Sequence, residues 1–105
     1  MTTETTKWDV TAHLDNEEAI FGYVNAAFED GDPALIAAAI GDVARARGMT
    51  RIARDAGVSR ESLYRALSDG GNPEFATVLK VLHALGMRLK AEPSHETLAE
   101  ARRSA

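Results

Sequence analysis

The sequence predicts an all-α fold of five helices, with short extended segments near the N- and C-termini. Apolar residues recur at helical spacing through most of the chain, and N-cap residues and glycines mark where individual helices begin and end. Only two short stretches alternate between apolar and polar residues, as a half-buried strand does. With 105 residues, the chain is long enough for one hydrophobic core. We therefore expect an N-terminal tail and extended arm over residues 1–14, one helical domain over 15–91, and a flexible C-terminal tail over 92–105.

The N-terminal arm leads directly into the first predicted helix. Residues 8–14 follow a polar tail and alternate, which places every second side chain on one apolar face. That face consists of Trp8, Val10, Ala12 and Leu14. Asp15 and Glu18 then resemble a capping box, and Gly31 ends the helix that they open. Its expected buried stripe is Ile20, Phe21, Val24, Ala27 and Phe28.

A second helix begins at Asp32-Pro33, an N-cap residue followed by a proline at the first helical position. Its expected core face is Leu35, Ile36, Ala39, Ile40, Val43 and Ala44. Gly41 lies inside this helix and costs about 1 kcal/mol relative to alanine, for which close packing by a neighbouring helix is a plausible reason. Gly48 ends the helix.

Residues 49–70 predict two short helices joined by a tight turn. Thr50 is positioned to cap the first of them, and Gly57 supplies the positive φ that the turn demands. Ser59 restarts the chain as an N-cap, and Leu63 faces inward from the second helix. A small residue, a glycine four positions later and an apolar residue six positions after that are the spacing of a helix-turn-helix.

The second helix of this pair presents an outward face suited to the major groove of DNA. That face consists of Arg60, Glu61, Ser62, Tyr64 and Arg65.

The last predicted helix follows Gly70-Gly71 and starts at Asn72-Pro73, again a cap and a proline. Its apolar positions are Phe75, Val78, Leu79, Leu82 and Leu85. Gly86 closes it, and residues 87–91 alternate as a second extended segment. Segments 8–14 and 87–91 can pair with each other, with their copies in a dimer or with another protein, or pack on their own helical bundle.

The formal net charge of −4 is unevenly distributed along the chain. Residues 1–40 hold one basic and eight acidic side chains, residues 41–65 hold six arginines and three acids, and residues 66–105 hold five of each sign. Such asymmetry lets one face meet phosphates while another meets a different partner. The alternative for the acidic first third of the chain is that these side chains only form a solvated surface without a partner.

Other functional classes find little support in the residues. There is no cysteine, which is compatible with a reducing cytoplasm, and neither a long apolar run nor a signal-peptide pattern, so we expect no membrane association. His13, His83 and His95 lack partners at metal-ligand spacing, and no glycine-rich phosphate loop or acid–base pair is evident. We therefore expect no catalytic residue, no metal, no cofactor and no enzyme activity.

The helix order and the turn at Gly57 resemble the lambda-repressor-like (XRE/Cro) helix-turn-helix fold. More specifically, residues 8–89 are similar to the putative addiction module antidote proteins, which are antitoxins encoded beside a small RelE/ParE-type toxin. The most specific parts of the resemblance are ARARGM at 44–49, SRESLYRALS at 59–68 and GNP at 71–73.

The resemblance implies a cytoplasmic DNA-binding antitoxin of a type II module, which neutralises its toxin and represses its own operon; the alternative is a stand-alone XRE-type regulator without a toxin. It places Thr50 and Arg51 at a DNA phosphate, and Arg60, Glu61 and Arg65 in the groove. Ser59 opens the same helix and is one of the expected DNA-binding residues. Ser62 can reach a phosphate or a base edge, and Tyr64 can touch the sugar-phosphate backbone or flank the core. Further phosphate-contact candidates are Arg45, Arg47 and Arg54.

Two partners besides operator DNA are expected. One short helix reads too few base pairs to be selective, so we predict a homodimer that reads two half-sites, with residues 74–85 and 87–91 as its contact. The acidic first third is the candidate contact for a basic toxin.

Overall fold

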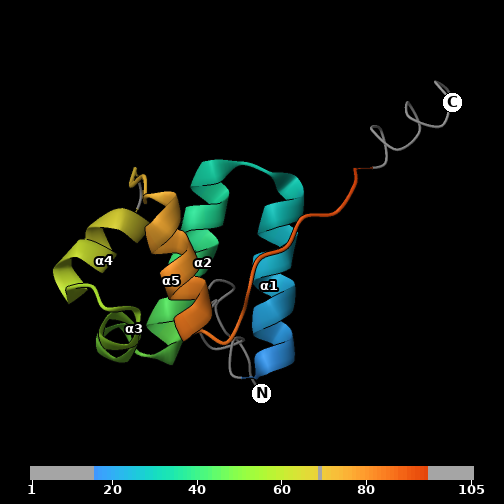
Figure 1. The fold of residues 1–105 in the computed structure, drawn as a ribbon. Helices are drawn as coiled ribbons and strands as arrows, with labels where there is room; N and C mark the ends of the chain where they lie inside the picture. The colour runs from blue at the N-terminus through green and yellow to red at the C-terminus, as the bar shows by residue number, and fades with distance from the viewer. Residues whose placement is uncertain (1–15, 69, 95–105) are drawn as a thin grey trace, which may run out of the picture.

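The computed structural model describes residues 16–68 and 70–94, and in these residues all regular structure is helical. The five helices are α1 (Glu17–Asp30), α2 (Pro33–Arg47), α3 (Met49–Ala56), α4 (Arg60–Leu67) and α5 (Phe75–Ala84) (Figure 1). The predicted all-α, five-helix fold is therefore confirmed for the described residues.

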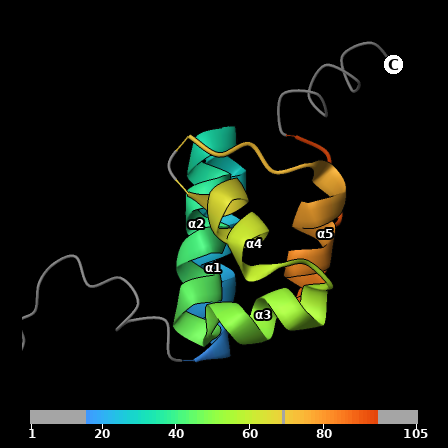
Figure 2. The same cartoon turned by 90° about the vertical axis from the view of Figure 1, so that its left-hand side faces the viewer.

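Helix α3 links the packed pair of α1 and α2 to α4 and α5. The antiparallel helices α1 and α2 pack along their lengths, and α3 crosses their lower end to reach α5 (Figures 1 and 2). Helix α4 packs on both α2 and α3, so its position depends on each of them. As a result, one side of α4 faces the bundle and the other faces solvent.

The core draws on all five helices. Its most deeply buried large side chains are each at most 2% exposed: Ile20, Val24, Ile40, Val43, Ile52, Leu63, Leu67, Val81 and Leu82. Two residues of this set, Leu63 and Leu67, come from α4, which is only eight residues long. Burial of two leucines in place of solvent contact is worth several kcal/mol, and this is what holds so short a helix in place.

The predicted start of the first helix was wrong by one residue. The cap is Asn16, whose side-chain oxygen accepts a hydrogen bond from the Ala19 backbone N–H at 2.8 Å. Asp15 lies outside the described residues. The other end agrees with the prediction, because Gly31 has φ 86° and donates its N–H to the Ala27 carbonyl.

Helix α2 begins and ends as its sequence predicts. The Asp32 carboxylate accepts from the Ala34 N–H at 3.0 Å, Pro33 is the first helical residue, and Gly48 ends the helix. Gly41 also confirms the packing argument: a Cβ there would lie 2.8 Å from the Leu67 carbonyl oxygen, so α2 and the end of α4 approach too closely for a side chain.

Thr50 does not cap α3, which corrects the sequence-based prediction. Helix α3 starts at Met49 with Gly48 as its cap residue, and no side-chain hydrogen bond closes this end. Met49 is 5% exposed, and including it in the helix directs its side chain into the core. Burial of Met49 therefore favours a helix start two residues earlier than the polar cap signal of Thr50 indicates.

Two predictions for the last helix were also wrong. Helix α5 starts at Phe75 with Glu74 as its cap residue, so Asn72 and Pro73 lie in the connection from α4. Val81 and Leu82 face the core, whereas Phe75 is 66% and Leu79 40% exposed. Leu35 on α2, expected in the core, is 43% exposed.

The chain after α5 runs beside α1 without forming a strand in the described residues (Figure 1). Gly86 has φ 84°, and the Met87 N–H donates to the Leu82 carbonyl at 2.8 Å, which is the reversal typical of a helix C-terminus. Met87 packs against the core. Segment 87–91 thus lies on its own bundle, whereas segment 8–14 falls outside the described residues.

Candidate nucleic-acid interface

Helices α3 and α4 are joined by a turn of three residues that fixes their relative orientation. Gly57 has φ 76°, the left-handed conformation predicted for it, and its N–H donates to the Arg54 carbonyl at 3.1 Å. The next N–H, from Val58, donates to the Ala53 carbonyl at 3.0 Å. These two hydrogen bonds terminate α3, and the chain then turns and continues into α4.

Ser59 opens α4 as its sequence predicts. Its hydroxyl oxygen accepts from the Ser62 backbone N–H at 3.0 Å, and the two serine hydroxyls lie 2.8 Å apart in a second hydrogen bond. Both hydroxyl groups therefore take part in the first turn of α4 itself. The remaining backbone N–H groups of this turn point outward at the positive end of the helix dipole.

The inner face of the α3–α4 pair is apolar and tightly buried. Leu63 is 0%, Ile52 2% and Ala53 3% exposed, as the helix-turn-helix spacing requires. Leu63 fixes the rotation of α4 about its own axis. The residues predicted to face outward do so.

That outward face contains two arginines and their polar neighbours. Arg60, Glu61, Ser62, Tyr64 and Arg65 are all exposed in the described structure. The Arg60 guanidinium lies over the Tyr64 ring, 5.3 Å from its centroid, in a cation–π contact. This contact restricts the long Arg60 side chain, although the residue as a whole is exposed.

The first turn of α3 adds a second polar surface. Thr50 and Arg51 are exposed there, and Arg51 forms a loose ion pair with Asp55 at 4.0 Å. Arg54 reaches the other oxygen of the Asp55 carboxylate at 3.6 Å. Such exposed pairs contribute little to stability, so the arginines can exchange this partner for a phosphate at small cost.

The other arginines of residues 41–65 are less available. Arg45 is held by Asp42 at 2.6 Å, and Arg47 is half-buried. Arg45, Arg47 and Arg54 were proposed together as phosphate contacts, but their surroundings differ. Of these three, only Arg54 has a largely exposed side chain, at 72%.

A polar cluster that the sequence did not reveal links α1 to α2. The Tyr23 hydroxyl donates to one oxygen of the Asp42 carboxylate at 2.6 Å, and Arg45 binds the other oxygen. Burial, together with the hydrogen bond to Asp42, raises the pKa of Tyr23 to about 12. Tyr23 and Asp42 are 19 residues apart, so no local pattern signals their contact.

The raised pKa of Tyr23 predicts a stability loss in alkali. An unfolded tyrosine ionises near pH 10, whereas the folded one stays protonated to about pH 12. Stability from this group is therefore complete below about pH 10 and falls as the pH rises from there towards 12. We expect urea titrations at pH 8 to 11 to show this decline, and Tyr23→Phe to reduce it. An equal decline in both proteins would contradict the assignment.

Gly71 packs closely against the C-terminal end of α4. A Cβ on Gly71 would lie 2.6 Å from the Arg65 carbonyl oxygen and would collide with the Ala66 carbonyl as well. The Gly71 N–H donates to the Ser68 carbonyl at 2.8 Å, and the Ser68 hydroxyl donates to the Arg65 carbonyl at 3.1 Å. This is a structural reason for glycine in the GNP sequence at 71–73 that sequence patterns alone did not provide.

Within residues 16–68 and 70–94, no group of three or more His, Asp or Glu side chains is arranged to hold a metal ion. His83 is exposed on α5, while His13 and His95 lie outside these ranges. None of the helices in the same part of the chain has the length and apolar character needed to cross a membrane.

Comparison with known proteins identifies the family. The profile of a family described as "probable addiction module antidote protein" matches residues 4–93. A protein of Haemophilus influenzae, described as uncharacterized, is 50% identical over 94 residues, which span 90% of this chain and 97% of the relative. No solved structure gives a significant match. The chain therefore belongs to the probable addiction module antidote protein family.

Proposed function

We propose that this protein is the DNA-binding antitoxin of a type II toxin–antitoxin module, which neutralises a RelE/ParE-type toxin and represses its own operon in the cytoplasm. We also infer that it acts by binding and not as an enzyme. Membership of the antidote family supports the antitoxin role. The observation that supports DNA binding most strongly is the outward face of α4, where Arg60 and Arg65 are exposed on a helix fixed by Leu63.

We infer that α3 and α4 act as a helix-turn-helix of the XRE/Cro type. In this arrangement α4 enters the major groove, where Arg60 or Arg65 donates twice to guanine O6 and N7, and Glu61 accepts from cytosine N4. We assign Ser62 to a phosphate or a base edge and Tyr64 to the sugar-phosphate backbone. Ser59 acts indirectly by ordering the first turn of α4.

Phosphate contacts are assigned to the start of α3. Thr50 and Arg51 are exposed at a helix N-terminus, where backbone N–H groups and a cation together favour an anion. These contacts fix the register of the protein on DNA without reading sequence.

Replacing Arg51 with alanine should weaken binding to all DNA sequences alike. Loss of one phosphate contact should reduce the slope of log K against log salt by about 1. Fluorescence anisotropy at several salt concentrations measures this slope on operator and unrelated DNA. Arg88→Ala is the matched control, since Arg88 is also exposed but lies beside α1. A selective loss on operator DNA alone would place Arg51 at a base instead.

A homodimer is needed for selective binding, and α5 offers a surface for it. Phe75 and Leu79 are one helical turn apart and are 66% and 40% exposed. Two exposed apolar side chains on one helix face support the predicted contact through residues 74–85. A two-fold dimer then places its two α4 helices on half-sites about one turn of DNA apart.

Phe75→Glu should convert this dimer to monomer at micromolar concentration. A charge on each side of a two-fold contact is desolvated and repelled by its copy. Sedimentation velocity measures the result, with Leu35→Glu as the control because Leu35 is 43% exposed on α2. A wild-type protein that sediments as a monomer and protects one half-site would rule out the dimer.

The toxin contact is assigned to the acidic N-terminal third. Residues 1–40 have a balance of one basic to eight acidic side chains, which suits a basic toxin. Ile20 and Val24 of α1 belong to the core, so removal of α1 would unfold the protein and test nothing about binding. A deletion must therefore stop at residue 15.

The proposed function is tested by an electrophoretic mobility shift on the DNA upstream of the gene, with and without the product of the neighbouring gene. We expect a salt-dependent shift and a further change when the neighbouring protein is added. Deletion of residues 1–15, which removes three of the eight acidic side chains, should weaken the latter effect. DNA binding without any effect of a neighbouring protein would favour the stand-alone regulator.

A further inference from the structure

Asp55 lies beside two exposed arginines of α3 and pairs with both of them. Its Oδ2 atom is 4.0 Å from Nε of Arg51, and its Oδ1 atom is 3.6 Å from Nε of Arg54. All three side chains face solvent, with exposed fractions of 65% for Arg51, 72% for Arg54 and 43% for Asp55. One carboxylate therefore partly neutralises two cations of the candidate phosphate-binding surface.

The stability of the fold gives little reason for an acidic residue at this position. Asp55 is the penultimate residue of α3, near the negative end of the helix dipole, where a carboxylate is unfavourable. Exposed ion pairs of this length offset that effect only weakly. Asp55 is also outside the hydrophobic core. The main consequence of its charge therefore lies at the surface that it shares with the two arginines.

We propose that Asp55 competes with DNA phosphates for Arg51 and Arg54 and thereby sets how tightly the protein binds any DNA, a role that rests on the proposed DNA-binding function. In the free protein the carboxylate pairs with both arginines. When α3 approaches DNA, a phosphate replaces the carboxylate at these side chains.

The cost of this exchange comes from the carboxylate that remains. Breaking two exposed ion pairs costs little. Arg51 and Asp55 are one helical turn apart, however, so the carboxylate stays close to any phosphate that Arg51 binds. The two negative charges then lie within a Debye length, which is about 10 Å at 0.1 M salt, and repel each other. Removal of the Asp55 charge should therefore tighten DNA binding.

The effect should be the same for every DNA sequence. Phosphates are present at all sites, and contacts to them carry no direct sequence information. Asp55 belongs to α3, whereas the proposed base contacts of Arg60 and Arg65 belong to α4. Asp55 thus sets the protein concentration at which the operator is half occupied, and leaves the preference for operator over unrelated DNA unchanged.

Asp55→Asn tests this role because it removes the charge and keeps the size of the side chain. Fluorescence anisotropy at low salt should show roughly threefold to tenfold tighter binding to operator and unrelated DNA alike, with a gain that shrinks as salt is added. Urea denaturation should show that the variant is at least as stable as the wild type, since α3 loses an unfavourable charge near its C-terminus.

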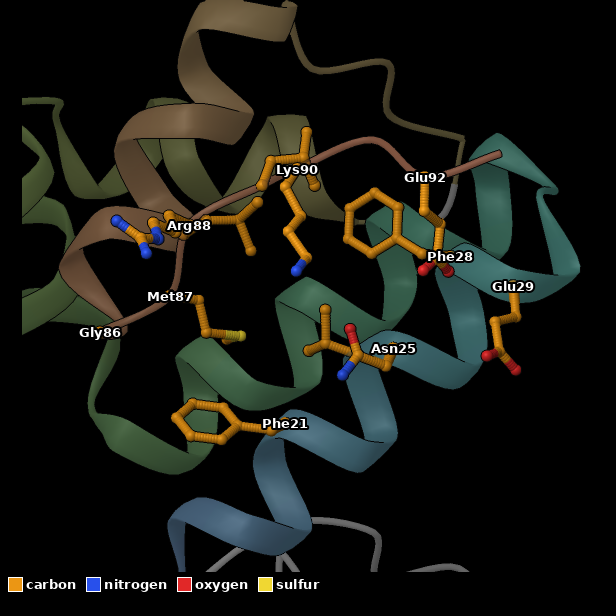
Figure 3. Close-up of a pocket in the computed structure, with 12 residues that line it drawn as sticks. Phe21, Asn25, Phe28, Glu29, Gly86, Met87, Arg88, Lys90 and Glu92 are labelled. Carbon is orange, nitrogen blue, oxygen red and sulfur yellow. The ribbon is translucent and has the colours of Figure 1, made fainter. Parts of the chain in front are cut away.

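Glu29→Gln is the matched control, because it changes the net charge by the same amount. Glu29 is exposed and lies on α1, beside a groove of about 760 Å³ that this helix forms with the chain after α5 (Figure 3). It is near the C-terminal end of α1, which is the end away from α3 (Figure 1). This control should change DNA affinity by less than about twofold.

The gain should also depend on the two arginines. In an Arg51→Ala/Arg54→Ala protein, the further change Asp55→Asn should tighten binding by less than about twofold. An undiminished gain in this background, an equal gain in Glu29→Gln, or no gain in Asp55→Asn while the wild type binds DNA would overturn the role of Asp55 and leave the proposed function intact. Failure of both the wild type and Asp55→Asn to bind DNA would instead overturn the proposed DNA binding, and the role of Asp55 with it.

Discussion

Gly71→Ala should lower the free energy of unfolding by roughly 1–3 kcal/mol. The added Cβ would lie 2.6 Å from the Arg65 carbonyl oxygen and still closer to the Ala66 carbonyl. Both obstacles are backbone atoms of α4, which cannot move aside as a flexible side chain can. Either Gly71 or the end of α4 must shift, and the hydrogen bond from Gly71 to Ser68 is strained in both cases.

The matched control is Gly22→Ala in α1. No atom outside its own helix lies within 4 Å of a Cβ at this position, so alanine should raise stability by about 0.5–1 kcal/mol through its higher helix propensity. Thermal and urea denaturation of the two variants should therefore show shifts of opposite sign. A Gly71→Ala protein as stable as wild type would show that the connection after α4 does not support this helix.

Arg60→Ala should cost roughly 1–3 kcal/mol of operator affinity and relax the preference at one base pair. Arginine recognises guanine through two parallel hydrogen bonds, and alanine can make neither. In the structure the Arg60 guanidinium lies over the Tyr64 ring, so part of the side-chain freedom is already restricted before binding. Binding to operator variants, substituted one base pair at a time, measures both effects.

Arg60→Lys separates base recognition from charge. Lysine keeps the positive charge but lacks the planar pair of donors, so it should retain affinity for unrelated DNA and lose most of the preference at the affected base pair. If Arg60→Ala weakens all sequences equally, Arg60 contacts a phosphate and the assignment of the groove contacts to α4 must be changed.

The helix boundaries that the sequence predicted correctly are those set by local chemistry. Gly31 and Gly57 adopt positive φ, and Ser59 accepts the hydrogen bond of an N-cap. In each case the signal lies within a few residues of the boundary itself, and no distant contact competes with it. The outward face of α4 was predictable for the same reason, because burial of Leu63 fixes the rotation of the helix.

The errors arose where tertiary packing overrides a local signal. Thr50 is a favourable cap residue, but burial of Met49 starts α3 earlier. Asn72-Pro73 is a favourable helix start, but α5 begins only at Phe75. Gly71 lies close to α4, and residues 72–74 connect it to α5. Phe75 fits the apolar period of α5, yet it faces away from the single-chain core.

Contacts between distant residues were not predictable from one sequence. The hydrogen bond between Tyr23 and Asp42 joins two helices, and neither residue belongs to a recognisable motif. The groove along α1 likewise depends on where the chain after α5 runs. For the candidate DNA surface, the sequence predicted which residues face outward, whereas it could not predict that Arg60 lies over Tyr64.

The role of α4 is tested most directly by titrating the purified protein against its own upstream DNA at low ionic strength. We predict saturable binding that weakens steeply with salt in the wild type and is strongly reduced in an Arg60→Ala/Arg65→Ala double variant of unchanged stability. Wild-type protein that leaves this DNA unbound, or a double variant that binds it equally well, would contradict the assignment of α4 to the major groove.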